Sequence, residues 1–116
     1  MKNLYSLTNP QKSIWLTEQF YKGSNINNIC GALTIKQPLD FEKFKQAINL
    51  FVKNNDSFRI CLTLDNNEVK QYIKDFSYFD IDIIDLKDAQ AVKDYEHYLA
   101  SFPLFDFDKL LFIFIK

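Results

Sequence analysis

Residues 40–53 read DFEKFKQAINLFVK and contain the clearest helical pattern in the chain. Asp40 stands where the N-cap of a helix accepts backbone hydrogen bonds. The apolar residues recur at helical spacing on one face, and the charged residues fall elsewhere. Such a large apolar stripe is costly to leave in water, so we expect this helix to pack against a sheet as part of the core. The stripe consists of Phe41, Phe44, Ala47, Ile48, Phe51 and Val52.

Two further helices are predicted, one on each side of this stretch. The first covers about residues 11–21, and its start resembles a capping box with Thr8 as the cap, Pro10 in the first turn and Gln11 three residues after the cap. The second begins after Asp88, which is another candidate cap, and Pro103 would end it.

Strand patterns occupy most of the remaining chain. The runs 59–64 and 68–74 flank Asp65-Asn66-Asn67, and this arrangement predicts a β-hairpin because Asn tolerates positive φ. Alternating or apolar runs predict further strands at 29–36, 80–86 and 110–115, the last of them fully buried. The resulting order αβαβββαβ predicts an α+β fold, a mixed sheet with helices packed on it.

Composition limits the classes of function. The chain has 116 residues, the size of one domain, and its 14 basic and 15 acidic side chains leave a net charge of −1. That balance removes the electrostatic argument for nucleic acid or an anionic membrane surface. No run approaches the roughly 20 apolar residues of a membrane span, and the first residues lack the apolar stretch of a secretory signal. We therefore expect an uncleaved cytoplasmic chain.

The chain contains few cysteine and histidine residues, which are the types that often act in catalysis or bind metals. Cys30 and Cys61 lie in separate strand-like runs, and we expect both to be small buried hydrophobic residues. The single histidine, His97, lies in the third predicted helix, on a face expected to be partly exposed rather than in a general-base position.

No complete catalytic or metal-binding set emerges from the remaining patterns. Asp80, Asp82 and Asp85 alternate with apolar residues, which favours a solvated strand face over a metal site. The sequence contains no Cys-x-x-Cys pair, nucleophile elbow, P-loop or dinucleotide fingerprint.

Residues 7–16 nevertheless carry a recognisable motif. Leu7-Thr8-Asn9-Pro10-Gln11-Lys12-Ser13-Ile14-Trp15-Leu16 resembles the opening motif of nonribosomal peptide synthetase condensation domains, S-x-A-Q-x-R-L/M-W/Y-x-L. Thr8 stands for the Ser, Gln11 for the Gln and Trp15 for the aromatic residue. Pro10 replaces the Ala, Ser13 replaces the Arg and Thr17 replaces the last Leu, so the match is partial.

A second motif of the same family follows at the right distance. Residues 54–62 stand where that family has R-H-E-x-L-R-T-x-F. Arg59 matches identically, and Asp56, Phe58 and Leu62 are conservative replacements for Glu, Leu and Phe. The segments 20–28 and 40–44 are also similar to the family's loop into its first strand and to its L-D-x-x-x-L helix start. The resemblance therefore spans nearly the whole chain.

This resemblance implies a chloramphenicol acetyltransferase-like fold built of two similar halves, of which residues 1–116 would be an incomplete N-terminal part. Condensation domains join an acyl group on the phosphopantetheine arm of one carrier protein to an amine on another, often in antibiotic biosynthesis. The implied partners are thus peptidyl or acyl carrier proteins, with no cofactor bound directly by this chain.

The active-site signature of the family, H-H-x-x-x-D-G, does not occur in these residues. An apolar strand that ends one residue before Lys116 indicates a truncated sequence, and we expect its sheet edge to promote self-association. We therefore expect the segment to be inactive alone. Related domains that epimerise, cyclise or acylate alcohols remain open. So does an alternative from another class, a non-catalytic half-fold module that docks a carrier or partner protein.

Three motif residues receive structural roles in this interpretation. Gln11 and Trp15 are expected to cap and pack rather than to touch substrate. Arg59 is the sole arginine of the chain, and the family implies that it forms a structural ion pair with the Asp of the later signature. The alternative is a strand-end arginine whose guanidinium lies in water.

Overall fold

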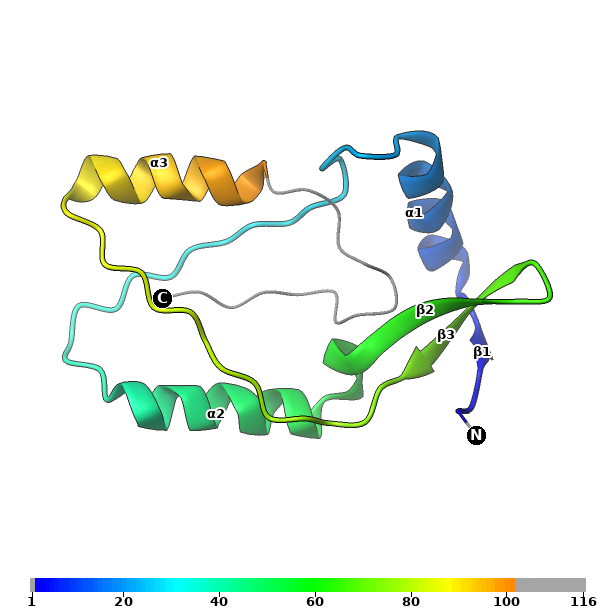
Figure 1. Ribbon diagram of the computed structural model, residues 1–116, viewed down its shortest axis with the longest axis horizontal. Helices are drawn as coiled ribbons and strands as arrows, with labels where there is room; N and C mark the ends of the chain where they lie inside the picture. The colour runs from blue at the N-terminus through cyan, green and yellow to red at the C-terminus, as the bar shows by residue number, and fades with distance from the viewer. Residues whose placement is uncertain (1, 102–116) are drawn as a thin grey trace. The chain divides into compact units, whose positions relative to one another are not determined.

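A computed structural model of the chain describes residues 2–101 (Figure 1). The described residues form two compact units. The first unit contains residues 2–7 and 37–83, and the second contains residues 8–36 and 84–101. Within this part of the chain the fold is α+β, with three α-helices, one short 3₁₀ helix and a single three-stranded sheet.

The sheet lies in the first unit and has the strand order β1-β3-β2. Strands β2 (Ile60–Asp65) and β3 (Glu68–Ile73) form the predicted hairpin, with Leu62 opposite Gln71. Asn66 and Asn67 turn the chain between them with φ values of 49° and 64°, the left-handed region that asparagine tolerates. The hairpin prediction is thus confirmed, together with its physical cause.

Strand β1 (Tyr5–Ser6) was not predicted, because two residues carry no periodic signal. It pairs antiparallel with β3, and the Gln71 side chain donates a hydrogen bond of 3.0 Å to the Ser6 carbonyl. Both described pairings are antiparallel, so the described sheet is not mixed as predicted.

Helix α2 (Phe41–Asn54) confirms the strongest sequence pattern, and Asp40 caps it by accepting a 3.1 Å hydrogen bond from the Lys43 N–H. Its apolar stripe is only partly core. Val52 is 1% exposed, whereas Ala47 is exposed and Phe51 is 46% exposed. The other buried apolar residues of the first unit are Leu7, Cys61, Tyr72 and Ile81.

A buried asparagine joins α2 to the segment that follows β3. Asn49 is 3% exposed, and its amide nitrogen donates to the Phe79 carbonyl at 2.9 Å while its amide oxygen accepts from the Phe79 N–H at 3.0 Å. The same amide nitrogen also donates to the Lys45 carbonyl at 3.0 Å. The side chain thereby satisfies both backbone groups of Phe79, as a neighbouring strand would.

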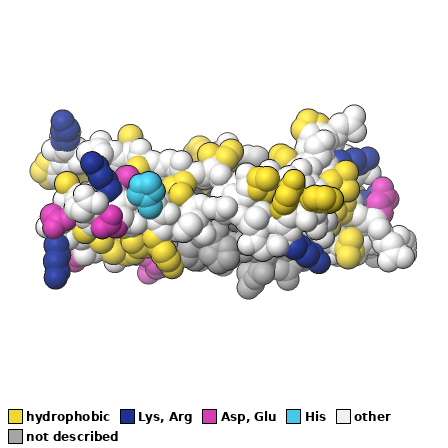
Figure 2. Space-filling view, turned by 90° about the horizontal axis from the view of Figure 1, so that it is seen from above, with side chains coloured by type: hydrophobic (Ala, Val, Ile, Leu, Met, Phe, Trp, Pro, Cys, Tyr) yellow, Lys and Arg dark blue, Asp and Glu magenta, His cyan; other side chains and the backbone are white. Residues whose placement is uncertain are grey.

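The second unit contains α1 (Asn9–Phe20) and α3 (Ala89–Ala100). Asp88 caps α3, as predicted, by accepting a 2.8 Å hydrogen bond from the Ala91 N–H. Apolar side chains lie at the surface over α1 (Figure 2), where Leu16 and Phe20 are 65% and 82% exposed. Among the described residues of this unit, Glu18 is the one buried side chain.

Two predicted strands are absent from the described structure. Residues 29–36 contain no strand, and residues 80–86 contain only a one-residue bridge at Asp82. Alternation of apolar and polar residues shows that a segment suits a sheet. A strand also needs a neighbouring strand to satisfy its backbone groups, and the segment's own sequence does not specify that neighbour. The predicted strand 110–115 and its sheet edge lie outside the described residues.

We expect Asn49→Ala to destabilise the chain by about 2–3 kcal/mol, because it removes both hydrogen bonds between the Asn49 side chain and the Phe79 backbone. Urea denaturation followed by circular dichroism measures this change as a lower midpoint. Gln46→Ala is the matched control, since Gln46 is an exposed residue of the same helix. Equal midpoints for the two variants would contradict the role assigned to Asn49.

Candidate functional site

The residues of the first motif hold the start of α1. The Thr8 N–H donates to Gln11 Oε1 at 2.8 Å, and the Gln11 N–H donates to Thr8 Oγ1 at 3.4 Å. Together with Pro10 in the first turn, these bonds form the predicted capping box. Trp15 is half-buried further along the same helix. Thr8 and Gln11 therefore act locally, on backbone groups that a helix end leaves without partners.

The residues of the second motif form a denser cluster at the junction of α2 and the hairpin. Helix α2 ends at Asn54, and the 3₁₀ helix η1 (Asp56–Arg59) follows after one residue. This turn brings the guanidinium of Arg59 onto the carboxylate of Asp56, three residues earlier. Asp56 and Arg59, two residues of the second motif, are thus direct partners.

Arg59 also binds two backbone carbonyls from different elements. Its Nη1 donates to the Lys74 carbonyl at 2.9 Å, just beyond β3, and its Nη2 donates to the Lys53 carbonyl at 3.3 Å, in the last turn of α2. The Lys74 N–H in turn donates to the Arg59 carbonyl at 2.8 Å. One side chain therefore connects the end of α2, the η1 turn and the end of the hairpin.

The Arg59 side chain is only 13% exposed, so the alternative of a guanidinium lying in water is wrong. The carboxylate that it binds here is Asp56, which stands in the place of the family's Glu. The Asp of the later signature, the partner implied by the family, is not among residues 1–116. The carbonyl acceptors of Lys53 and Lys74 could not be predicted, because a backbone oxygen carries no sequence signature.

Arg59→Lys should destabilise the chain by about 2 kcal/mol, because an ammonium group cannot reach three separated acceptors that the planar guanidinium binds together. Thermal or urea unfolding monitored by circular dichroism measures the loss. Lys53→Ala is the control, since it removes an exposed side chain and keeps the carbonyl that Arg59 uses. A lysine variant as stable as the parent chain would refute the junction role.

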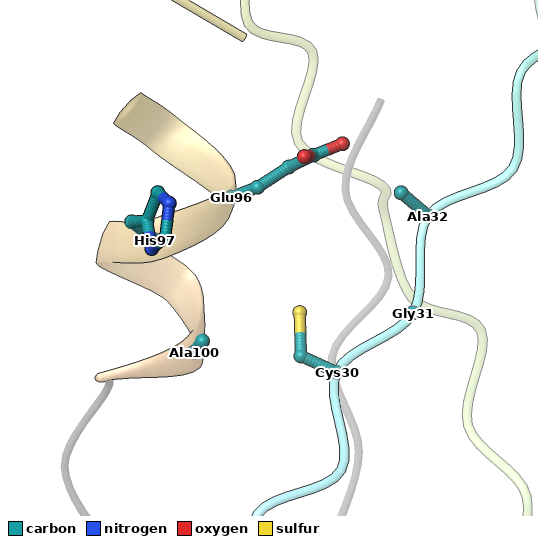
Figure 3. Close-up of a pocket in the computed structure, with 6 residues that line it drawn as sticks. All are labelled: Cys30, Gly31, Ala32, Glu96, His97 and Ala100. Atoms are coloured by element: carbon teal, nitrogen blue, oxygen red, sulfur yellow. The ribbon is translucent and has the colours of Figure 1, made fainter. Parts of the chain in front are cut away.

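A hollow of about 270 Å³ lies in the second unit between α3 and an extended segment (Figure 3). Residues Cys30, Gly31 and Ala32 line one side of it, and Glu96, His97 and Ala100 of α3 line the other. The Glu96 carboxylate extends across the hollow towards the 30–32 segment, and the Cys30 sulfur also projects into the space between them (Figure 3).

The exposure of Cys30 corrects one prediction about the cysteines. Cys61 is fully buried, as predicted, but Cys30 is exposed because its segment has no neighbouring strand in the described structure. His97 is exposed on α3, in agreement with the predicted exposed face. No group of three or more acidic, cysteine or histidine side chains placed to hold a metal ion occurs within residues 2–101.

The aspartates 80, 82 and 85 do not act together. Asp80 instead forms an ion pair with Lys45 of α2, with 3.2 Å between Asp80 Oδ1 and Lys45 Nζ. Lys45 Nζ also lies 3.3 Å from Oε2 of Glu42 on the same helix. The hydrogen bonds to Asp80 and Glu42 raise the pKa of Lys45 above its ordinary value of 10.5, although partial burial opposes this shift. Hydrogen bonds from Lys45 and from the Ile81 N–H lower the pKa of Asp80 below its ordinary value of 3.8.

These pKa shifts predict a lower and an upper pH limit to the stabilisation that the Lys45–Asp80 pair provides. A lowered carboxyl pKa stabilises the fold above pH 3.8, and this contribution disappears as the pH falls through the folded-state value. A raised ammonium pKa stabilises it below pH 10.5, and this contribution disappears as the pH rises through the folded-state value. The stability difference between the parent chain and Asp80→Asn should therefore be present at pH 7 and shrink at both extremes.

Urea denaturation at several pH values measures that difference. It should also fall in 1 M salt, because the Asp80 side chain is 81% exposed and the pair is screened by solvent ions. Asp82→Asn serves as the control, since Asp82 is an exposed neighbour outside this pair. An Asp80→Asn effect that is the same at pH 2 as at pH 7 would contradict the assignment.

Comparison with known proteins places this chain in a family. The condensation domain model matches residues 1–106, a range that includes both the capping box of α1 and the Arg59 junction. The chain belongs to the condensation domain family. Each helix within residues 2–101 is too short or too polar to qualify as a candidate membrane span.

Several curated synthetases are similar to this condensation-family chain. Surfactin synthase subunit 1 of Bacillus subtilis (strain 168) is 36% identical over 117 residues, which cover 93% of the chain. A plipastatin synthase from the same organism is 26% identical over 97% of the chain, and tyrocidine synthase 3 of Brevibacillus parabrevis is 24% identical over 90% of it. The chain spans only 2–4% of the length of these relatives.

Proposed function

We propose that this chain forms part of the N-terminal lobe of a condensation domain in a nonribosomal peptide synthetase. The family match over residues 1–106 carries the proposal, and the similarity to surfactin, plipastatin and tyrocidine synthases supports it. The lobe would have a chloramphenicol acetyltransferase-like architecture. The whole domain would form an amide bond between an acyl group and an amine, each carried by a separate protein.

The reaction itself defines what this part of the domain would contribute. An amine that attacks a thioester must be held close to the carbonyl carbon, and a positioned group must manage its proton. In this proposal the chain supplies scaffold: the capping box orients α1, and the Arg59–Asp56 junction fixes the end of α2 relative to the hairpin. Neither cluster is assigned to the reacting atoms.

The 116 residues are proposed to be inactive by themselves. Their single histidine, His97, is exposed on α3, and no H-H-x-x-x-D-G sequence accompanies it. The phosphopantetheine arms would belong to peptidyl or acyl carrier proteins, which are the proposed partners, so the chain would bind no cofactor of its own. The parent synthetase would work in the cytoplasm, and its products would include peptide antibiotics.

A chimera provides the sharpest test of the scaffold role. Residues 1–106 replace the matching stretch of surfactin synthase subunit 1, and amide formation between loaded donor and acceptor carriers is measured by mass spectrometry. We expect the chimera to fold and to form product, and His97→Ala to leave its rate unchanged. In the same assay the 116-residue chain alone should give no product above the protein-free background.

Two results would overturn these assignments. Amide formation by the 116-residue chain alone would refute the proposed inactivity, and a soluble, folded chimera without activity would refute the scaffold role. The source gene offers an independent check, because codons that follow Lys116 should encode H-H-x-x-x-D-G in frame within about 40 residues if the family spacing holds. A stop codon after Lys116, or a continuation without paired histidines, would favour the non-catalytic docking module instead.

A further inference from the structure

Residues 21–28 connect α1 to the extended segment that lines the hollow, and they bind a helix at each end. Asn27 Nδ2 donates a 2.8 Å hydrogen bond to Glu18 Oε1 of α1, and Asn25 Nδ2 donates one of 2.8 Å to the Ala100 carbonyl at the end of α3. Two backbone bonds of 3.0 Å, from Ser24 to Tyr21 and from Asn28 to Asn25, keep the loop compact between these contacts.

Hydrogen bonds contribute more to holding the segments of the second unit in place than in the first unit, because the second unit buries little apolar surface. Within the described part of the second unit no apolar side chain is fully buried, and Ile29 and Leu33 are 100% and 85% exposed. Hydrophobic contacts of those residues therefore contribute little to the position of the extended segment. The side-chain amides of Asn25 and Asn27 supply directional contacts in their place.

We propose that residues 21–28 act as a strap that ties the end of α3 to α1 and thereby holds Ala100 in place beside the hollow. Ala100 both lines the hollow and accepts the Asn25 hydrogen bond, so release of that bond loosens the end of α3 that lines the hollow. Figure 3 shows the Ala100 side chain on the face of α3 that looks towards Cys30.

The two ends of the strap differ in strength. Glu18 is only 6% exposed, and a hydrogen bond to a buried carboxylate is stronger than one to a neutral carbonyl. The bond from Asn25 to Ala100 is exposed and joins two neutral groups. The strap should therefore open at Asn25 while Asn27 remains on Glu18, and the opening would regulate how close the Cys30 thiol lies to α3.

Cross-linking between the two sides of the hollow tests this order of events. Ala100→Cys keeps the backbone carbonyl that Asn25 uses and places a second thiol opposite Cys30. Under a mild oxidant the full 116-residue chain carrying this change should form an intramolecular disulfide. Adding Asn25→Ala should slow its formation roughly three- to tenfold, the range expected for loss of one neutral hydrogen bond.

Two controls identify the cause of any change. Lys22→Ala alters an exposed side chain of the same loop and should leave the cross-linking rate unchanged. Cys30→Ser should abolish the disulfide, since Cys61 is fully buried. An Asn25→Ala rate equal to that of the Ala100→Cys chain, or an equal slowing by Lys22→Ala, would overturn the proposal.

Amide hydrogen exchange gives a second measurement on a chain without added cysteine. Asn25→Ala should accelerate exchange at Asn28, whose N–H binds the Asn25 carbonyl inside the strap, and leave the amides of α2 unchanged. If residues 21–28 of the unaltered chain exchange as fast as an unfolded peptide, no strap exists and the proposal fails. Neither experiment depends on catalysis, so its failure is distinguishable from failure of the condensation-domain assignment.

Discussion

The guanidinium of Arg59 is the contact on which the organisation of the first unit depends. It joins a carboxylate from η1, a carbonyl from the last turn of α2 and a carbonyl that follows β3. A helix end leaves its last carbonyls without intrahelical partners, and a hairpin end does the same at its last residue. A planar group with five donors can satisfy several such acceptors together, which a lysine cannot.

This arrangement carries a cost that the other contacts must offset. The Nε of Arg59 is buried and has no hydrogen-bond partner among residues 2–101, and an unsatisfied buried donor costs about 1–3 kcal/mol. Hydrogen bonds that involve a charged group contribute about 1.5–3 kcal/mol each, so the binding of Asp56 and the two carbonyls outweighs it. The Asn49 amide then extends the connection from α2 to Phe79.

The two units are stabilised by different physical means. The first contains every fully buried apolar residue of the described chain, and its polar contacts join elements that already share a core. The second contains capped helices and an extended segment whose apolar side chains are largely exposed. In that unit the strap of residues 21–28 replaces packing with two amide hydrogen bonds. The condensation domain match includes parts of both units, so a common scaffold role does not require a common mode of stabilisation.

The sequence by itself determined what depends on neighbours along the chain. Caps at Thr8, Asp40 and Asp88 act within three residues, and the turn at Asn66 and Asn67 needs only a backbone conformation that asparagine tolerates. The three helices, the hairpin and both family motifs could therefore be identified from the sequence.

Only the tertiary structure decided what depends on a partner distant in sequence. The strands predicted at 29–36 and 80–86 were wrong in the described structure because alternation does not supply a neighbouring strand, and for the same reason Cys30 is exposed. The carbonyls bound by Arg59 and the reach of Asn25 to Ala100 were equally hidden, since every residue has a carbonyl and its sequence does not say which donor will meet it. Local conformational preferences are written in short stretches of sequence, whereas the pairing of distant polar groups exists only once the chain has folded.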